Sequence, residues 1–130
     1  MEYSIPDESM VKEIVRKVLL HRGVVESQAE LRREVLKHLQ HRNGEYTISG
    51  KRLRRIALEM KDVKVEIHCK TTDVEVNEMD KCPVCGSEME KIENMTLEGE
   101  KITIGFKCVH CPYWTGHKLR VPIRYVFRKR

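Results

Sequence analysis

The fold of this 130-residue chain is decided by two short segments, CPVCG at residues 82–86 and CVHC at residues 108–111. Each contains a Cys-x-x-Cys pair, and the roughly twenty residues between the pairs are the spacing of four-cysteine zinc sites. One such pair presents two thiolates from one side of a tight turn, and two turns complete a tetrahedron around Zn²⁺. Pro83 fixes its own φ, and Gly86 permits a left-handed backbone after the first turn. We therefore expect one structural Zn²⁺. Its ligands are Cys82, Cys85, Cys108 and Cys111.

Other uses of these cysteines are open at the level of sequence. The same thiolates could hold a mononuclear iron, as in rubredoxin, although Pro112 stands where that family has glycine. Two reduced pairs without a metal are a further alternative. A disulfide framework is disfavoured, because the chain does not begin with the basic and apolar layout of a signal peptide. His110, inside the second pair, could replace a cysteine as ligand, but four cysteines already suffice.

The residues around the two pairs favour a small β unit. Alternation predicts strands at residues 88–92 and 101–107 with a turn at residues 97–100. Tyr113 and Trp114, beyond the second pair, could pack over the metal site or stack on an unpaired base. We expect a zinc ribbon at residues 78–130 with a basic C-terminal extension, in which Pro122 restricts any strand to a sheet edge. Its core is small, so the metal must contribute folding free energy on the order of 10 kcal/mol.

The N-terminal half carries three amphipathic helix patterns. The first lies between Asp7 and Gly23, with apolar residues three and four positions apart. The second begins with the capping box of Ser27 and ends at Asn43. Ser49 caps a third helix. Its expected range is residues 50–60.

Strand patterns follow these helices. Residues 45–48 favour a short strand, and residues 62–69 alternate as a longer one. We expect a turn at residues 71–73 and a return strand at residues 74–76. Three helices followed by a hairpin are typical of a winged helix-turn-helix domain, with an unrelated three-helix unit as the alternative. The predicted fold class is α+β, with residues 1–77 forming the winged helix-turn-helix domain and residues 78–130 the zinc ribbon.

The net charge of +5 is distributed unevenly along the chain. Residues 1–61 hold 13 basic and 9 acidic side chains, residues 62–100 hold 4 and 11, and residues 101–130 hold 8 and none. Two basic blocks favour a polyanionic partner, although a solvated tail could explain the last block. No apolar run approaches the about 20 residues of a membrane span, so we expect a cytoplasmic protein with no membrane partner.

The third helix pattern is the sharper nucleic-acid signal. Its cations lie opposite or beside the apolar stripe around Leu53, where a helix entering a major groove needs them. They are Lys51, Arg52, Arg54 and Arg55. A second group of candidate phosphate contacts follows the second cysteine pair. Its members are Lys118, Arg120, Arg124, Arg128, Lys129 and Arg130. A solvated helix face is the plainer interpretation of the first cluster.

Enzymatic chemistry finds little support. A four-cysteine site leaves no position for a bound water, which indicates a structural ion. His68 and Cys69 are neighbours on a predicted strand and would point to opposite faces, so we interpret Cys69 as a small buried thiol. His117 could bind a phosphate or simply be exposed. We therefore expect a protein that is not an enzyme.

With both halves placed, the chain resembles small archaeal proteins in which a winged helix precedes a zinc ribbon, and more remotely archaeal transcription factor E. The matching residues are SGKRLRR at residues 49–55, CPVCG at residues 82–86, Cys108 and Cys111. The resemblance implies a DNA-binding transcription regulator or a polymerase-associated factor, with duplex DNA and a transcription-machinery protein as partners. Two alternatives stand beside it, an RNA- or ribosome-associated zinc-ribbon protein and a non-catalytic adaptor. Nothing in the sequence fixes whether it forms a homodimer.

Overall fold

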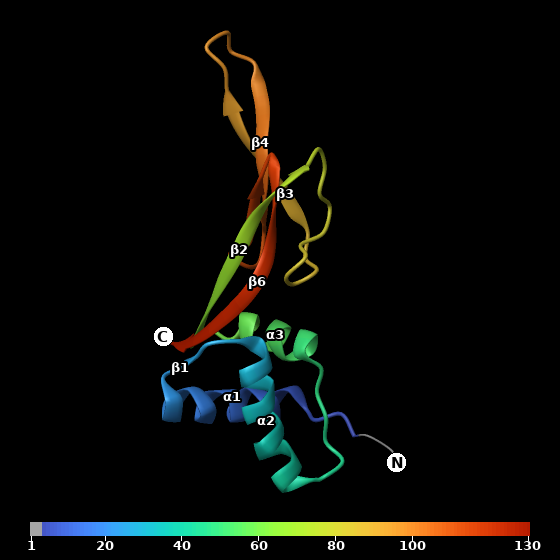
Figure 1. Ribbon diagram of the computed structural model, residues 1–130, viewed down its shortest axis with the longest axis vertical. Helices are drawn as coiled ribbons and strands as arrows, with labels where there is room; N and C mark the ends of the chain where they lie inside the picture. The colour runs from blue at the N-terminus through green and yellow to red at the C-terminus, as the bar shows by residue number, and fades with distance from the viewer. Residues whose placement is uncertain (1–3) are drawn as a thin grey trace. The chain divides into compact units, whose positions relative to one another are not determined.

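Three helices begin and end at the residues that their capping signals predict. The computed structural model describes residues 4–130 and places the helices at Glu8–Arg22 (α1), Gln28–Arg42 (α2) and Gly50–Glu59 (α3) (Figure 1). The Oγ of Ser27 accepts a hydrogen bond from the Glu30 amide at 3.1 Å. Ser49 caps α3 in the same way. The three predicted helices are confirmed, and the serine caps of α2 and α3 satisfy backbone amides that would otherwise lack a partner.

Gly23 ends α1 with a positive φ of 78°, and its amide donates to the Leu19 carbonyl at 2.7 Å. Asp7 occupies the position before α1, but its side chain accepts no capping hydrogen bond. The apolar faces of the helices meet in one core around Ile14, Leu31 and Leu53, all fully buried. Each such side chain contributes about 1.5–3 kcal/mol by leaving water, so packing stabilises the helices more than their propensity does.

The first sheet joins strands that are distant in sequence. It contains Val24–Val25 (β1), Val63–Glu75 (β2) and Lys118–Lys129 (β6), in the order β1–β6–β2. The strand predicted at residues 62–69 is confirmed, but the predicted turn at residues 71–73 and return strand at residues 74–76 are wrong. β2 continues through residues 71–75 because its partner is β6, and the Thr72 hydroxyl donates to the Leu119 carbonyl at 2.9 Å.

The basic C-terminal extension also has a different structure from the one expected. Residues 118–129 form β6, whose end pairs with β1 in the register Val24↔Arg128. Pro122 lies outside that pairing, so its missing N–H does not interrupt it. The short strand predicted at residues 45–48 is reduced to a single bridge between Tyr46 and Ser4.

The second sheet surrounds the cysteines. It contains Met89–Met95 (β3), Lys101–Cys108 (β4) and Trp114–Gly116 (β5), in the order β3–β4–β5. The two strands and the turn predicted between the cysteine pairs are thus confirmed. A register shift between Ile92 and Glu93 marks a β-bulge in the long β3–β4 hairpin.

The chain divides into two compact units. The segment ending at Glu66 and the segment Arg124–Arg130 form the first, called here the helical unit, and Ile67–Ile123 form the second, called the metal unit. The metal unit is therefore an insertion in the sequence of the helical unit. This division differs from a single boundary between residues 77 and 78, because β2 and β6 each run from one unit into the other. Among residues 4–130, no helix has the length and apolar character needed to cross a bilayer.

Candidate metal centre

The four predicted cysteines converge on one point in the metal unit. Their Sγ atoms all lie within 4.8 Å of one another. The Sγ atoms of Cys82 and Cys111 are 3.5 Å apart, and those of Cys85 and Cys108 are 3.4 Å apart. A tetrahedron with metal–sulfur bonds of about 2.3 Å has edges of about 3.8 Å. The predicted convergence is confirmed, and the four cysteines are positioned to bind one metal ion.

Local hydrogen bonds build the first turn. The Cys82 amide donates to the Ser87 carbonyl at 2.8 Å, and the Gly86 amide donates to the Cys82 carbonyl at 2.9 Å. Gly86 has a φ of 78°, the left-handed conformation predicted for this position. The Val84 amide points at the Cys82 sulfur at 3.3 Å. Such amides stabilise a thiolate, so the turn is organised for deprotonated sulfur.

The second turn repeats this arrangement at the end of β4. The amides of His110 and Cys111 both donate to the sulfur of Cys108 at 3.3 Å. The Cys108 amide donates to the Tyr113 carbonyl at 2.9 Å, which closes the turn. His110 itself is exposed, and the ligand cluster found among the described residues contains only the four cysteines. The geometry therefore favours cysteine over His110 as the fourth ligand.

The thiols differ in their ease of deprotonation. Burial raises the pKa of Cys82 and that of Cys111. Burial acts in the same direction on Cys85, but hydrogen bonds from Ser87 and from the neighbouring thiols outweigh it and lower its pKa to about 7. Cys85 is also the one ligand of the four that is only half-buried. A bound cation would displace the remaining protons, because thiols coordinate metals as thiolates.

Cys69 stands apart from this cluster. It is half-buried, not fully buried as expected, and burial raises the pKa of its thiol. The four clustered cysteines already complete a tetrahedron without Cys69, and a closed tetrahedral site of this kind suits a structural ion.

The two aromatic residues after the second turn have separate environments. Tyr113 is 1% exposed, and its hydroxyl donates to the Arg120 carbonyl at 2.5 Å, so it packs inside the metal unit. Trp114 is 49% exposed, and the Arg120 guanidinium lies 3.9 Å from its ring centroid. Sequence reasoning placed both residues near the metal turns but missed this cation–π contact, which depends on the return of β6.

The four cations predicted on α3 separate into two pairs. Lys51 and Arg55 are exposed, and no hydrogen bond or ion pair within residues 4–130 engages either side chain. Arg52 instead donates to the Pro6 carbonyl at 3.0 Å, and a second nitrogen of its guanidinium is buried without a partner. Arg54 donates to Gln28 at 2.9 Å and lies 4.8 Å from the ring centroid of Tyr125.

Most of the predicted C-terminal cations also have partners. Lys118 contacts the Glu75 carboxylate at 3.5 Å, and Arg128 contacts the Glu66 carboxylate at 2.6 Å. Arg130 donates to the Val63 carbonyl at 3.3 Å. Arg124 and Lys129 are exposed. The described structure therefore does not present these residues as one free basic tail.

Comparison with known proteins gives no independent assignment, since no family model, curated protein or solved structure matches the chain at a significant level. The fold and the site define a mixed α+β protein with four cysteines positioned to bind one metal ion.

Proposed function

We propose that this is a zinc-containing, non-catalytic DNA-binding protein whose helical unit is a winged helix-turn-helix domain. The order helix, strand, helix, helix, strand, strand and the sheet order β1–β6–β2 support this interpretation. In it, the parts of β2 and β6 that belong to the helical unit are the strands of the wing, and the metal unit is inserted in the sequence between Glu66 and Arg124. α3 is the helix that enters the major groove.

The observation that carries the proposal is the pair of free cations on α3. Lys51 and Arg55 are one turn apart and exposed, whereas Leu53 and Ile56 between and beside them are buried. A groove-binding helix needs this division, because its inner face anchors it and its outer cations remain available for phosphates or guanine. Arg52 and Arg54 then have a different role from the one predicted, which is to hold α3 against Pro6 and α2.

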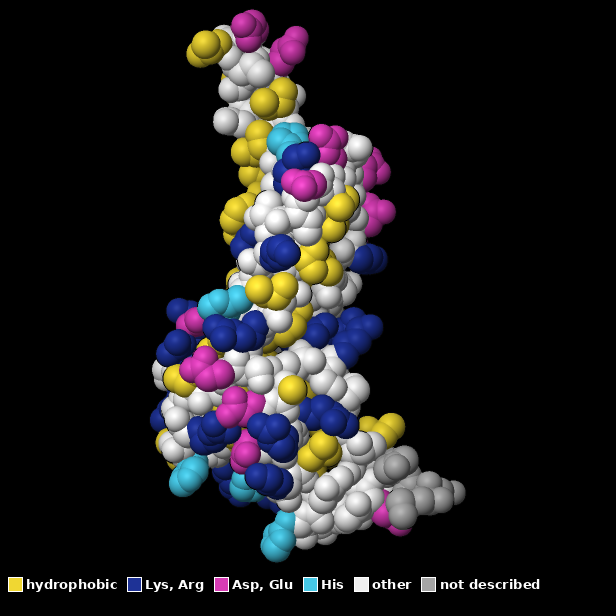
Figure 2. Space-filling view, in the orientation of Figure 1, with side chains coloured by type: hydrophobic (Ala, Val, Ile, Leu, Met, Phe, Trp, Pro, Cys, Tyr) yellow, Lys and Arg dark blue, Asp and Glu magenta, His cyan; other side chains and the backbone are white. Residues whose placement is uncertain are grey.

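Charge supports the helical unit as the part that binds DNA. It contains 18 basic and 11 acidic residues, a net of +7, whereas the metal unit contains 7 and 9, a net of −2. Figure 2 shows dark blue Lys and Arg side chains gathered over the helices. Four thiolates around one divalent ion would make the metal unit more negative still, which disfavours phosphate contacts there.

Zinc is the proposed ion. The site offers four sulfurs in a closed arrangement, a donor set that suits Zn²⁺ or iron. A structural role requires no redox change, which favours zinc. Elemental analysis of purified protein should give one zinc per chain. A coloured protein with one iron per chain would contradict this assignment.

The DNA proposal is tested with the double variant Lys51→Ala/Arg55→Ala. Its matched control is Lys12→Ala/Lys17→Ala, which removes the same charge from the ion-paired side chains of α1. Loss of two phosphate contacts should reduce the slope of log affinity against log salt by about 2, whereas the control should keep the slope.

Duplex DNA and single-stranded RNA of equal length should be compared in the same salt series. The proposal requires tighter binding to duplex DNA. Equal slopes for the two variants would remove α3 from the interface, and a preference for RNA would favour the alternative of an RNA-associated protein. The alternative of a non-catalytic adaptor would be favoured by two results together. The wild type would not bind DNA, and the α3 double variant would still bind a protein partner with an affinity that does not depend on salt.

A further inference from the structure

The turn between β3 and β4 exposes apolar side chains on an ordered backbone. Leu97 is fully exposed, at 104% of its reference area, and Met95 and Ile102 are 62% and 45% exposed. The Thr96 amide donates to the Glu100 carbonyl at 2.8 Å, and Gly99 adopts a φ of 86°. Hydrogen bonds within the turn thus hold Leu97 in solvent. Met95 pairs with Lys101 and Ile102 pairs with Asn94, so Met95 and Ile102 lie on opposite faces of the hairpin. Leu97, held in solvent at the turn itself, is the apolar side chain that the turn offers to a partner.

The same turn is acidic. Glu93, Glu98 and Glu100 lie within or beside it, against one cation, Lys101. Figure 2 shows apolar and acidic side chains together over the β3–β4 turn. A negative surface of this kind repels phosphate, so nucleic acid is not its partner. The occupant that fits is a protein cleft with an apolar lining and cations at its rim.

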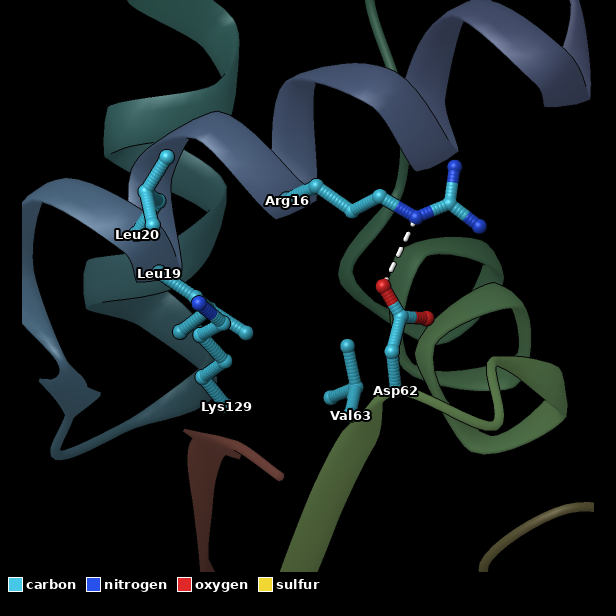
Figure 3. A pocket seen from close by; sticks show the side chains of 6 residues that line it. All are labelled: Arg16, Leu19, Leu20, Asp62, Val63 and Lys129. Atoms are coloured by element: carbon cyan, nitrogen blue, oxygen red, sulfur yellow. Dashed lines mark hydrogen bonds and ion pairs between the residues drawn. The ribbon is translucent and has the colours of Figure 1, made fainter.

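The helical unit carries a cleft of that chemistry, called here the α1 cleft. Its volume is about 220 Å³, enough for one aliphatic side chain. It is lined by Arg16, Leu19, Leu20, Asp62, Val63 and Lys129 (Figure 3). Leu20 is 68% exposed, whereas its neighbour Leu19 is buried.

The cations of the α1 cleft can receive acidic side chains. Arg16 donates to the Asp62 carboxylate at 2.8 Å, the contact drawn in Figure 3, and this pairing neutralises the one acidic residue among those that line the cleft. Lys129 is exposed and lies beside Leu19, on the side of the cleft away from Arg16 and Asp62 (Figure 3). Because Arg16 is paired with Asp62, the charged residues of the lining have a net charge of +1, supplied by Lys129, which complements Glu98 and Glu100.

We propose that the β3–β4 turn mediates self-association, with Leu97 of one copy packed in the α1 cleft of a second copy. The opposite net charges of the two units, +7 and −2, favour a contact between unlike units of different molecules. The contact is heterologous, since turn and cleft are different surfaces. It uses none of the α3 cations, so it stands or falls independently of DNA binding.

Sedimentation velocity of the full zinc-bound chain tests the proposal at concentrations from about 10 μM to 1 mM, a range suited to a small interface. The wild type should form dimers or larger species that dissociate as salt is raised. Leu97→Asp and Leu20→Asp should each be monomeric. Val74→Asp, which changes another exposed apolar residue of the metal unit, should associate like the wild type.

Mixing the two monomeric variants gives the decisive result. Leu97→Asp retains an intact cleft and Leu20→Asp retains an intact turn, so an equimolar mixture can form one contact and should stop at a 1:1 dimer. Circular dichroism and metal content should confirm that each variant is folded. If Leu20→Asp is not folded, Lys129→Glu is used in its place as the variant with an altered cleft. The cleft of Lys129→Glu should then bind the turn of a second variant, Glu98→Lys, because the two charges are exchanged.

Three results would overturn the proposal. The first is a wild type that stays monomeric to 1 mM. The second is association that Leu97→Asp leaves unchanged. The third is a mixture of folded, complementary variants that forms no dimer.

Discussion

Removal of the metal should unfold the metal unit and leave the helical unit folded. The reason lies in the difference between their cores. Over its described residues, the helical unit buries 17 apolar side chains in one cluster. In the metal unit, the large apolar side chains buried besides the cysteines are Val84, Phe106 and Tyr113, at 1%, 4% and 1% exposure. No cysteine of the metal centre belongs to the helical core.

The magnitudes favour a dependence on metal. Three buried apolar side chains contribute about 5–9 kcal/mol at about 1.5–3 kcal/mol each. Four-thiolate zinc binding is worth about 10–16 kcal/mol in small metal-folded domains. That amount is comparable to or greater than the whole stability of a typical domain, about 5–15 kcal/mol. We therefore expect the metal unit to lose its fold on chelation, with β2 and β6 retained over residues 63–66 and 124–129.

Three measurements on the same chelated sample check this. Helical circular dichroism should persist, because all three helices lie in the helical unit. The fluorescence of Trp114, the single tryptophan of the chain, should shift as its contact with Arg120 is lost. Hydrogen exchange at Phe106 and Tyr113 should become fast.

Cys108→Ser should reproduce the effect of chelation. Cys69→Ser is the matched control, because Cys69 lies outside the ligand cluster. Slow exchange at Phe106 in the metal-free protein would refute the reasoning on the small core. Loss of the helices together with the metal unit would refute the independence of the two units.

Two further predictions concern single contacts. Gly105→Ala should destabilise the metal unit by about 1–3 kcal/mol, since a Cβ at Gly105 would lie 2.3 Å from the Thr115 carbonyl oxygen of β5. Gly116→Ala, on the paired strand, is the control with room for its Cβ, and equal denaturation midpoints for the two variants would contradict the clash. The hydrogen bond from Arg16 lowers the pKa of Asp62, so its carboxylate stabilises the fold at neutral pH. That contribution should begin to fall as the pH drops below about 4, the pKa of an aspartate in the unfolded chain, and should be gone once the pH lies below the lowered pKa of the folded state. The difference in urea midpoint between wild type and Asp62→Asn should shrink over that range. A difference that grows on acidification would reverse the assigned sign.

Several structural features could be predicted from the sequence because their causes are local. Ser27 and Ser49 cap helices through amides three residues away. The two cysteine turns form within four or five residues, and the β3–β4 hairpin joins strands separated by a short turn. Each of these features follows from neighbouring residues.

The partner of β2 could not be predicted in this way. Its threonines at positions 71 and 72 suit a turn or a strand equally, and only the return of β6 from far along the chain decides between them. A predicted turn pairs a strand with the segment that follows it, whereas in this chain residues 76–117 lie between β2 and its partner β6. Arg52 and Arg54 show the same limit, since helical periodicity placed them outward while Pro6 and Gln28 hold them inward.

Sequence alone determined the metal ligands, the helix ends and the hairpin between the cysteine pairs, because residue spacing and short-range hydrogen bonds fix them. Tertiary structure decided which strands pair, which cations of α3 stay free, and that the metal unit interrupts the helical one. Those features depend on contacts between distant segments of the chain: Arg54 and Gln28 are 26 positions apart, Arg52 and Pro6 are 46 apart, and Glu66 and Arg128 are 62 apart. Local patterns carry no information about the identity of such a partner.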